Sequence, residues 1–245
     1  MIIFIFIIAH WYLSLFSQTF FLHRYAAHKM FEMSPFWEKI FFVFTYITQG
    51  SSYLSAYGYG VMHRMHHAYA DTEKDPHSPK YDKTILSMMW RTKETYTDIF
   101  DNKVEIEAQF TNGVPHWEAF DKIAHSWISR LFWAAFYITF YIFFADAWWV
   151  FLFLPMHFVM GPLHGVVINW FAHKFGYRNY EVTNTSMNLL PFDFLMFGEG
   201  YHNNHHKDGT RANFGVKWYE LDLAYPIIKA FDFIGIIKLN KGETV

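Results

Sequence analysis

Residues 131–171 read LFWAAFYITFYIFFADAWWVFLFLPMHFVMGPLHGVVINWF, and Asp146 is the only charged side chain among them. A stretch of this length can cross a hydrocarbon core of about 30 Å twice as helix. Trp148 and Trp149 follow the charge, and tryptophans are enriched at the membrane–water interface. The pattern predicts two membrane-spanning helices, at about 131–145 and 148–171, joined by a tight turn.

A third span is predicted at the start of the chain. Residues 1–22 read MIIFIFIIAHWYLSLFSQTFFL and carry no charged side chain. A cleaved signal peptide fits poorly, because no basic segment precedes the apolar run and no small-residue cleavage site precedes His23. The chain therefore reads as one domain, residues 1–245, with about three membrane-spanning helices.

The rest of the chain is more polar. Residues 36–62 begin with an apolar run and continue as TQGSSYLSAYGYG, which favours an interfacial or re-entrant segment. Residues 71–125 carry most of the acidic side chains and indicate short helices outside the membrane. The fold class predicted is an all-α integral membrane protein with a helical cap.

Charge indicates the orientation. All 20 lysines and arginines fall outside the three predicted spans, and the turn at 145–147 has none. Basic residues accumulate on the cytoplasmic side of membrane proteins. We expect residues 23–130 and 172–245 to be cytoplasmic, in a bacterial inner membrane rather than in the endoplasmic reticulum.

Composition excludes several classes of function. Charged residues make up 17% of the chain, below the usual quarter for a soluble domain. The net charge of −2 and the lack of a nucleic-acid-binding motif argue against a nucleic-acid partner. The absence of cysteine excludes disulfides, a thiolate nucleophile and a cysteine-ligated iron–sulfur cluster. Electrons for any redox reaction must come from another protein.

Eight of the 15 histidines form three clusters, HRYAAH, HRMHH and HNNHH. Their histidines are His23, His28, His63, His66, His67, His202, His205 and His206. On a helix the spacing HxxHH directs three imidazoles to one point. His23 and His28 are five residues apart and diverge on an ideal α-helix, so we expect a helix end there or two different metals.

Eight imidazoles exceed what one ion needs, so two metals are predicted. Imidazole suits iron, zinc, copper and nickel, and a structural zinc site or chelating surface histidines are the alternatives. His164 lies in the last predicted span, where ionisable groups often line a cavity. The other isolated histidines are expected to pack or to form interfaces: His10, His116, His125 and His157.

Four segments together resemble the membrane fatty acid desaturases, closest to the acyl-CoA Δ9 (stearoyl-CoA) type: HRYAAH, HRMHHAYADTEKDPHSP, NWFAHKFGYR and GEGYHNNHH. The resemblance runs from about residue 15 to the C-terminal helix. It implies that His173 joins the eight clustered histidines in binding two irons, and that Asn169 holds a metal-bound water. It also implies that O₂ is activated to place a cis double bond, at Δ9, in a saturated acyl chain, with electrons from a ferredoxin- or cytochrome-b5-like donor.

Three acidic residues lie in or beside these segments. Asp71, Asp75 and Glu199 are candidates to orient the imidazoles and to offset the charge of the metals, and the alternative is a solvated surface charge or a helix cap. Gln49 and His164 are candidates to contact the substrate.

The chain departs from the stearoyl-CoA type in two ways. It has one predicted span before the first histidine cluster where that type has two, so it is a short form. The segment SSYLSAYGYGVM carries no charge where acyl-CoA enzymes carry Trp, Arg and Asp near the CoA head group. The acyl carrier can be CoA, a phospholipid or an acyl-carrier protein.

Two other functions compete. A lipid or alkane hydroxylase would use the same di-iron site and add oxygen to the carbon. A zinc-binding membrane protein would have no redox activity, although zinc could also replace iron in a purified desaturase, because imidazoles accept it readily. Iron with O₂ can remove hydrogen from a methylene group, and zinc cannot.

Overall fold

The computed structural model describes residues 1–240, and most of them are helical. Two helices are long and apolar enough to cross a membrane. One is Ile2–Ala27, formed by α1 (Ile2–Ser17) and its continuation η1 (Gln18–Ala27), and the other is α7 (Trp127–Phe144). The predicted class, an all-α membrane protein, is confirmed by this content.

The span predicted at about 148–171 is bent in the structure. Trp148–Phe158 and Met160–His173 meet at an angle of 71°. The first half contains η3 (Trp148–Phe153) and α8 (Leu154–Phe158), and the second contains α9 (Met160–Asn169) and η4 (Phe171–His173). Pro162 explains the break, because a proline has no N–H and its ring clashes with the carbonyl four residues earlier. The span predicted at about 148–171 is therefore a bent pair of helices, and together the two halves are long and apolar enough to cross a membrane once.

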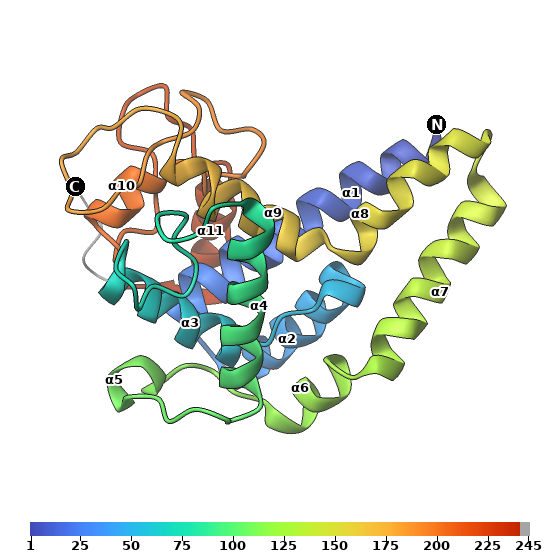
Figure 1. Ribbon diagram of the computed structural model, residues 1–245, viewed down its shortest axis with the longest axis horizontal. Coiled ribbons are helices and arrows are strands. Elements are labelled where there is room, and N and C mark those ends of the chain that lie inside the picture. The colour runs from blue at the N-terminus through green and yellow to red at the C-terminus, as the bar shows by residue number, and fades with distance from the viewer. Residues whose placement is uncertain (241–245) are drawn as a thin grey trace.

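The apolar helices α1, α7, η3 and α8 form an arm that extends from the rest of the molecule (Figure 1). Ile3, Tyr141 and Val150 are buried together where the start of α1 meets α7 and η3. Deeper in the arm, His10 Nδ1 lies 2.6 Å from His157 Nδ1, and Tyr141 Oη lies 3.0 Å from His157 Nε2. Both ring nitrogens of His157 and the Nδ1 of His10 thus have buried polar partners, as predicted for packing histidines.

The segment predicted to be interfacial or re-entrant forms two helices joined by a turn. Ser34 caps α2 (Pro35–Gln49), which begins with a proline as helices commonly do. The short η2 (Gly50–Ser52) reverses the chain, and Ser55 caps α3 (Ala56–Tyr69). The second histidine cluster lies on α3, so this turn carries it toward the first cluster.

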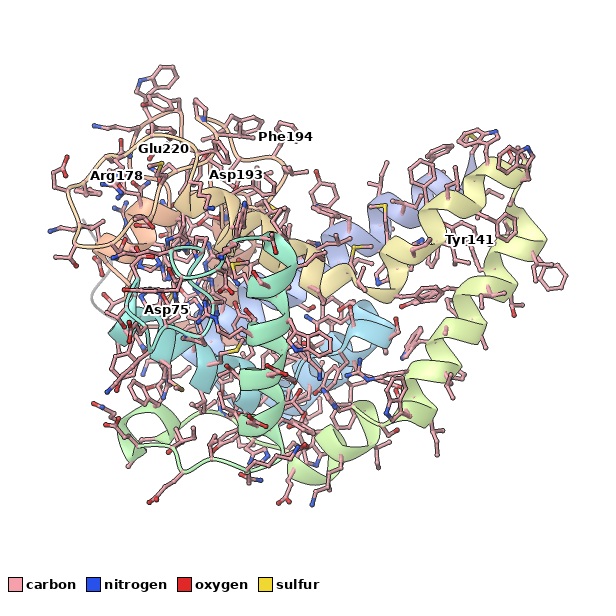
Figure 2. All side chains as sticks on the ribbon, viewed as in Figure 1. Asp75, Tyr141, Arg178, Asp193, Phe194 and Glu220 are labelled. Atoms are coloured by element: carbon pink, nitrogen blue, oxygen red, sulfur yellow. The ribbon has the colours of Figure 1, made fainter. Side chains whose placement is uncertain are left out.

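The remaining elements form a cap around the end of η1. They are α4 (Ile85–Phe100), α5 (Ala108–Thr111), α6 (Glu118–Ala124), α10 (His202–Lys207) and α11 (Ala224–Phe233). The one sheet among the described residues pairs β1 (Phe31–Met33) with β2 (Ile237–Leu239), antiparallel, which places the C-terminal segment beside the first cluster. Figure 2 shows Asp75 inside this cap and Tyr141 away from it, in the arm.

Candidate metal centre

Nine histidines meet in the cap as two groups. The first histidine group is His23, His28, His63, His67 and His205, and the second histidine group is His66, His173, His202 and His206. Within each group, one ring nitrogen from every member lies within 4.8 Å of those of all the others. These are the nine histidines named above as candidate ligands, and they come from η1, its C-cap, α3, η4 and α10.

Each HxxHH cluster divides between the two groups. In α3, His63 and His67 belong to the first group, and His66 belongs to the second. In α10, His202 and His206 belong to the second group, and His205 to the first. The two outer histidines of a cluster are i and i+4 and share a helical face, whereas the middle one points to the neighbouring group. The expectation that each cluster directs all three rings to one point is corrected by this division.

A π-helical turn brings His23 and His28 together. The segment η1 is hydrogen-bonded between residues five apart, and His28 N–H donates to His23 C=O at 3.1 Å. A spacing of five, which diverges on an α-helix, therefore places both rings on one side, with centroids 4.9 Å apart. Both belong to the first histidine group, and His28 is the residue that ends the helix.

The separations between ring nitrogens fit an octahedral metal ion. His205 Nε2 lies 3.0 Å from His23 Nε2 and 3.0 Å from His67 Nε2, and His63 Nε2 lies 2.9 Å from His28 Nε2. Two ligands at right angles, each with a metal–nitrogen bond of about 2.1 Å, lie about 3.0 Å apart. His205 has two such neighbours, so a single N–H···N hydrogen bond does not explain the arrangement.

The second group repeats this geometry with four nitrogens. His202 Nε2 lies 3.0 Å from the Nε2 atoms of His173 and His206, and His206 Nε2 lies 3.2 Å from that of His66. The groups adjoin, since the rings of His67 and His206 stack with centroids 4.4 Å apart. The residues therefore fit two neighbouring ions, one with five imidazole ligands and one with four.

Burial keeps six of the clustered histidines neutral. Desolvation, followed by repulsion from neighbouring rings, holds the pKa of His28, His63 and His67 well below the ordinary value. The same two causes lower the pKa of all three histidines of the last cluster. A neutral imidazole offers a lone pair to a metal, so these residues are in the ligating form at neutral pH.

Glu199 supports the first histidine group from behind. Its Oε2 lies 2.6 Å from His23 Nδ1, and its Oε1 accepts hydrogen bonds from Arg24 and from Thr19. Burial raises the pKa of Glu199, but the charges and hydrogen bonds of His23 and Arg24 outweigh it, so its pKa lies below the ordinary value. Asp222 pairs with the other side of Arg24 at 2.7 Å.

Two glycines make this position possible. Gly198 has φ +99°, and a Cβ there would lie 2.2 Å from Asp222 Oδ1. A Cβ on Gly200 would lie 2.8 Å from the carboxylate of Asp193. The sequence GEG therefore turns Glu199 inward between two carboxylates that leave no room for other side chains.

Asp75 and Asp71 support the second histidine group. Asp75 Oδ1 lies 2.9 Å from His66 Nδ1, and Asp71 Oδ1 lies 4.0 Å from His173 Nδ1. Asp75 Oδ2 also accepts from the Asp71 N–H at 2.8 Å. All three acidic candidates thus lie behind imidazole rings, at the nitrogen that faces away from the group.

Several neighbours of the two groups were not predicted. Thr185 Oγ1 lies 3.1 Å from His173 Nδ1, and Asn184 Nδ2 lies 3.2 Å from His206 Nδ1. They come from a loop, and only long-range contacts bring them to the site. His77 is buried, and its ring lies 4.2 Å from that of His66, in a small cluster with Asp75. The feature of the sequence that could have identified His77 is its position in the segment DPHSP, residues 75–79.

A cavity of about 520 Å³ reaches the two groups from outside. His23 and His63 of the first group and His202 of the second line it, and so do Asn169 and His164. Its other walls are mostly apolar, with Leu15, Met62, Met89, Phe158, Val159 and Ile168 among them.

The two substrate candidates differ in position. His164 Nδ1 lies 3.3 Å from Gln18 Oε1 at the cavity wall. Gln49 is buried, but it is not among the described residues that line the cavity. Its Oε1 accepts a hydrogen bond from the Leu54 N–H at 2.9 Å. Gln49 therefore holds the turn before α3 and does not face the cavity.

Comparison with known proteins identifies a family for the chain. The family model "fatty acid desaturase" matches residues 1–233. The "sn-1 stearoyl-lipid 9-desaturase" of Synechocystis sp. is 28% identical over 224 residues, 88% of this chain and 64% of that protein. The "Delta-9 acyl-lipid desaturase 2" of Arabidopsis thaliana is 27% identical over 87% of this chain and 66% of its own length. The "Acyl-CoA C20 Delta5-desaturase" of Anemone leveillei is 25% identical over 90% and 68%. The chain spans about two thirds of the length of these relatives.

Proposed function

The chain belongs to the fatty acid desaturase family, and from this membership we propose that it inserts a cis double bond, at Δ9, into a saturated acyl chain. The observation that carries the proposal is the cavity, because it is mostly apolar and is lined by histidines of both groups. An acyl chain in this cavity would pass directly beside both candidate metal positions. Membership of the family makes the protein an oxidoreductase. The specific reaction, a cis double bond placed at Δ9, is our proposal.

We propose that the metals are two irons. The first histidine group would supply five ligands and the second four, and Asn169 at the cavity wall would hold a metal-bound water. With O₂ and two electrons from a ferredoxin- or cytochrome-b5-like partner, iron supplies the oxidising power that an unactivated methylene group requires.

The chain's own residues bind, orient and exclude water. Glu199 and Asp75 hold His23 and His66 through their Nδ1 atoms, so that the Nε2 atoms stay directed into the groups. The apolar cavity walls keep an acyl chain extended and exclude water from the reacting carbons.

The Δ9 position is supported by the relatives. Two of those above carry Δ9 or 9-desaturase in their names, and both are named for lipid-linked acyl chains. A third is named for a Δ5 position on acyl-CoA, so the family itself includes several positions and carriers. The names of the relatives therefore favour Δ9 for this chain, but they include more than one acyl carrier.

We propose the cytoplasmic side of a bacterial inner membrane for the metal centre. All 20 lysines and arginines lie outside the membrane-spanning segments as the sequence delimits them, and the turn at 145–147 has none. Cytoplasmic electron carriers would then reach the cap.

Product analysis tests the reaction. The purified, iron-loaded protein is given a stearoyl lipid, O₂ and a reducing partner, and the products are separated and identified by mass spectrometry. We expect an alkene two mass units lighter than the substrate. A hydroxylated product without a new double bond would establish the alternative, a lipid or alkane hydroxylase with the same site.

Metal analysis tests the proposal against a zinc protein without redox activity. Protein expressed with iron supplementation should contain two irons per chain and consume O₂ when reduced. Protein that rejects iron and consumes no O₂ under these conditions would contradict a di-iron enzyme. Bound zinc alone would not decide, because imidazole ligands also accept zinc.

A further inference from the structure

The outer end of the cavity is basic. Away from the histidine groups, α4 contributes Lys93 and Thr97 to its wall, and the start of α7 contributes Trp127 and Arg130. This end, defined by Lys93, Thr97, His125, Trp127 and Arg130, is called the cavity mouth below.

Arg130 at the mouth has neutral partners only. Its Nε donates to His125 C=O at 3.3 Å, one terminal nitrogen donates to Ser51 C=O at 3.2 Å, and the other donates to His125 Nε2 at 3.0 Å. Within residues 1–240 none of its hydrogen-bond partners is a carboxylate. These acceptors use three of the five guanidinium N–H groups, so two remain for a ligand.

The surrounding groups do not neutralise this charge. Burial, and then the charge of Arg130, lower the pKa of His125 to about 4, so that ring is neutral. The carboxylate of Asp121 is engaged by the hydroxyls of Tyr53 and Ser55, at 2.6 and 2.9 Å. Asp101, whose charge also acts on His125, pairs with Lys103 at 2.6 Å. A half-buried cation without an anion is costly, and an anionic ligand would relieve that cost.

Lys93 adds a second cation. Its side chain is exposed, and its Nζ lies 5.0 Å from the Trp90 ring. The nearest acid along the chain, Glu94, accepts a hydrogen bond from Trp90 Nε1 at 2.8 Å. No ion pair involves Lys93 among the described residues, so neither basic group of the mouth has a carboxylate partner there.

The helix segments that carry the mouth residues also carry exposed apolar side chains, called the apolar rim below. Leu86 and Trp90 on the outer side of α4 are 81% and 63% exposed, and Trp127 and Ile128 at the start of α7 are 78% and 82% exposed. The opposite side of α4 is buried, so the helix is amphipathic with large apolar residues facing out. Such a helix, with tryptophan and lysine together, is typical of the membrane interface, and α7 begins there.

We infer that the cavity mouth opens sideways into the membrane interface and binds the phosphate of a membrane phospholipid, whose acyl chain enters the cavity while the lipid stays in the bilayer. Arg130 and Lys93 contact the phosphate, and the apolar rim contacts neighbouring lipid. This inference rests on the proposed function, and it names the carrier that the reaction uses. A sugar-headed lipid would leave Arg130 without an anion. A water-soluble acyl-CoA carries phosphate too, but would not use the exposed apolar rim.

The test compares three stearoyl carriers in vesicles. The bulk lipid is a dioleoyl galactolipid, which lacks phosphate and is already unsaturated. Equal amounts of distearoyl phosphatidylglycerol, distearoyl galactolipid or stearoyl-CoA are added, and products are measured with the iron-loaded protein. We expect the phosphatidylglycerol to be desaturated several-fold faster than either of the others.

Three variants test whether the residues of the cavity mouth cause the preference for phosphatidylglycerol over galactolipid. Lys93→Gln should reduce the phosphatidylglycerol-to-galactolipid ratio about two- to fivefold, the size expected for an exposed charge pair. Arg130→Gln should reduce it about tenfold, because a charge-assisted hydrogen bond is lost. Lys39→Gln is the matched control, because Lys39 is also exposed and lies 5.1 Å from a tryptophan ring, Trp117, outside the residues that line the cavity. It should leave the ratio unchanged. If Arg130→Gln fails to fold, Arg130→Met, which also removes the charge at similar length, replaces it.

Binding is measured separately, so that the inference and the proposed function can fail independently. Native mass spectrometry of the protein released from these vesicles should show retained phosphatidylglycerol, which is reduced in Lys93→Gln and not in Lys39→Gln. If phosphatidylglycerol is retained selectively but no carrier is desaturated, the phosphate-binding role of the cavity mouth is supported and the proposed function is contradicted. Equal rates for the two lipids, a preference for stearoyl-CoA, or an unchanged ratio in both mouth variants would overturn the inference.

Discussion

Three of the nine histidines are held by a partner side chain on the side of the ring that faces away from the site. Glu199 holds His23, Asp75 holds His66, and Thr185 holds His173, all at the Nδ1 atom. Fixing Nδ1 fixes both the rotation of the ring and the nitrogen that is free to ligate. At the scale of single residues, the site therefore depends on these buried partners as much as on the imidazoles themselves.

The first residue-scale prediction concerns His67. Its Nε2 lies 3.0 Å from that of His205, and its ring stacks on His206, so it touches both groups. His67→Ala should abolish turnover and lower the bound metal while the protein remains in the membrane. His116→Ala is the control, since His116 is exposed and stacks only on Tyr57 among ring partners. Turnover and metal content are measured together, and wild-type activity in His67→Ala would exclude it as a ligand.

A second residue-scale prediction concerns Glu199. Glu199→Gln keeps the shape but removes the only carboxylate beside His23 Nδ1 among the described residues and leaves Arg24 with Asp222 alone. Metal affinity should fall about 10- to 100-fold, the usual effect of removing a partner of a metal-ligating histidine. Metal titration of the metal-free protein gives this number. Glu105→Gln, at an exposed position, should titrate as wild type. An unchanged affinity in Glu199→Gln would show that the carboxylate only packs.

The sequence predicted which residues form the site better than how they divide. All nine histidines and the three acids lie at the two groups, because cluster spacing and the neighbouring motifs identify them. The division of each HxxHH between two groups was missed, since it depends on where α3 and α10 face each other. Thr185 and Asn184 were missed because a loop residue without a motif gives no signal before the chain is folded.

At the scale of elements, two irregular helices position the centre. The π-helical η1 aligns His23 with His28, and the 71° bend after Phe158 turns α9 so that Asn169 lines the cavity. Hydropathy predicted the spans but not these irregularities. The bend had a local cause in Pro162, whereas the π-helical hydrogen bonding has no marker in the sequence apart from the five-residue spacing itself.

An element-scale prediction tests the contact of α3 with η1. A Cβ on Gly60 would lie 2.9 Å from Val114 Cγ1 and 3.3 Å from the Ala26 carbonyl oxygen. Gly60→Ala should therefore lower the stability by about 1–3 kcal/mol, as overpacking does. Thermal unfolding in detergent measures it. Gly165→Ala, another helical glycine with only Asn169 at 3.8 Å, should not lower the melting temperature. Equal melting temperatures for Gly60→Ala and wild type would mean that the two helices can separate freely.

At the scale of the whole molecule, the apolar arm and the cap have different tasks. The arm holds the protein in lipid, and the cap assembles the two histidine groups at the end of the arm (Figure 1). The all-α class was predictable because charge and hydropathy are distributed so unevenly along the chain. The small sheet of β1 and β2 was not, since it pairs two three-residue strands from opposite ends of the sequence.

A whole-molecule prediction tests the orientation. The chain has no cysteine, so single cysteines can be introduced without background labelling. Asp146→Cys, in the turn after α7, should react with a membrane-impermeant maleimide in intact cells. Lys217→Cys, exposed on the cap, should react only after the membrane is opened. Labelling of both positions from the same side would refute the cytoplasmic placement of the cap.

The central claim is that the two histidine groups together desaturate an acyl chain, and one measurement tests it most directly. The fatty acid profile is recorded for a desaturase-deficient bacterial host that expresses either this chain or its His67→Ala variant at the same membrane level. The account predicts new monounsaturated chains with a cis bond at Δ9 with the wild-type chain and none with the variant. A profile identical to that of the empty host, or the same unsaturated chains from the variant, would contradict it.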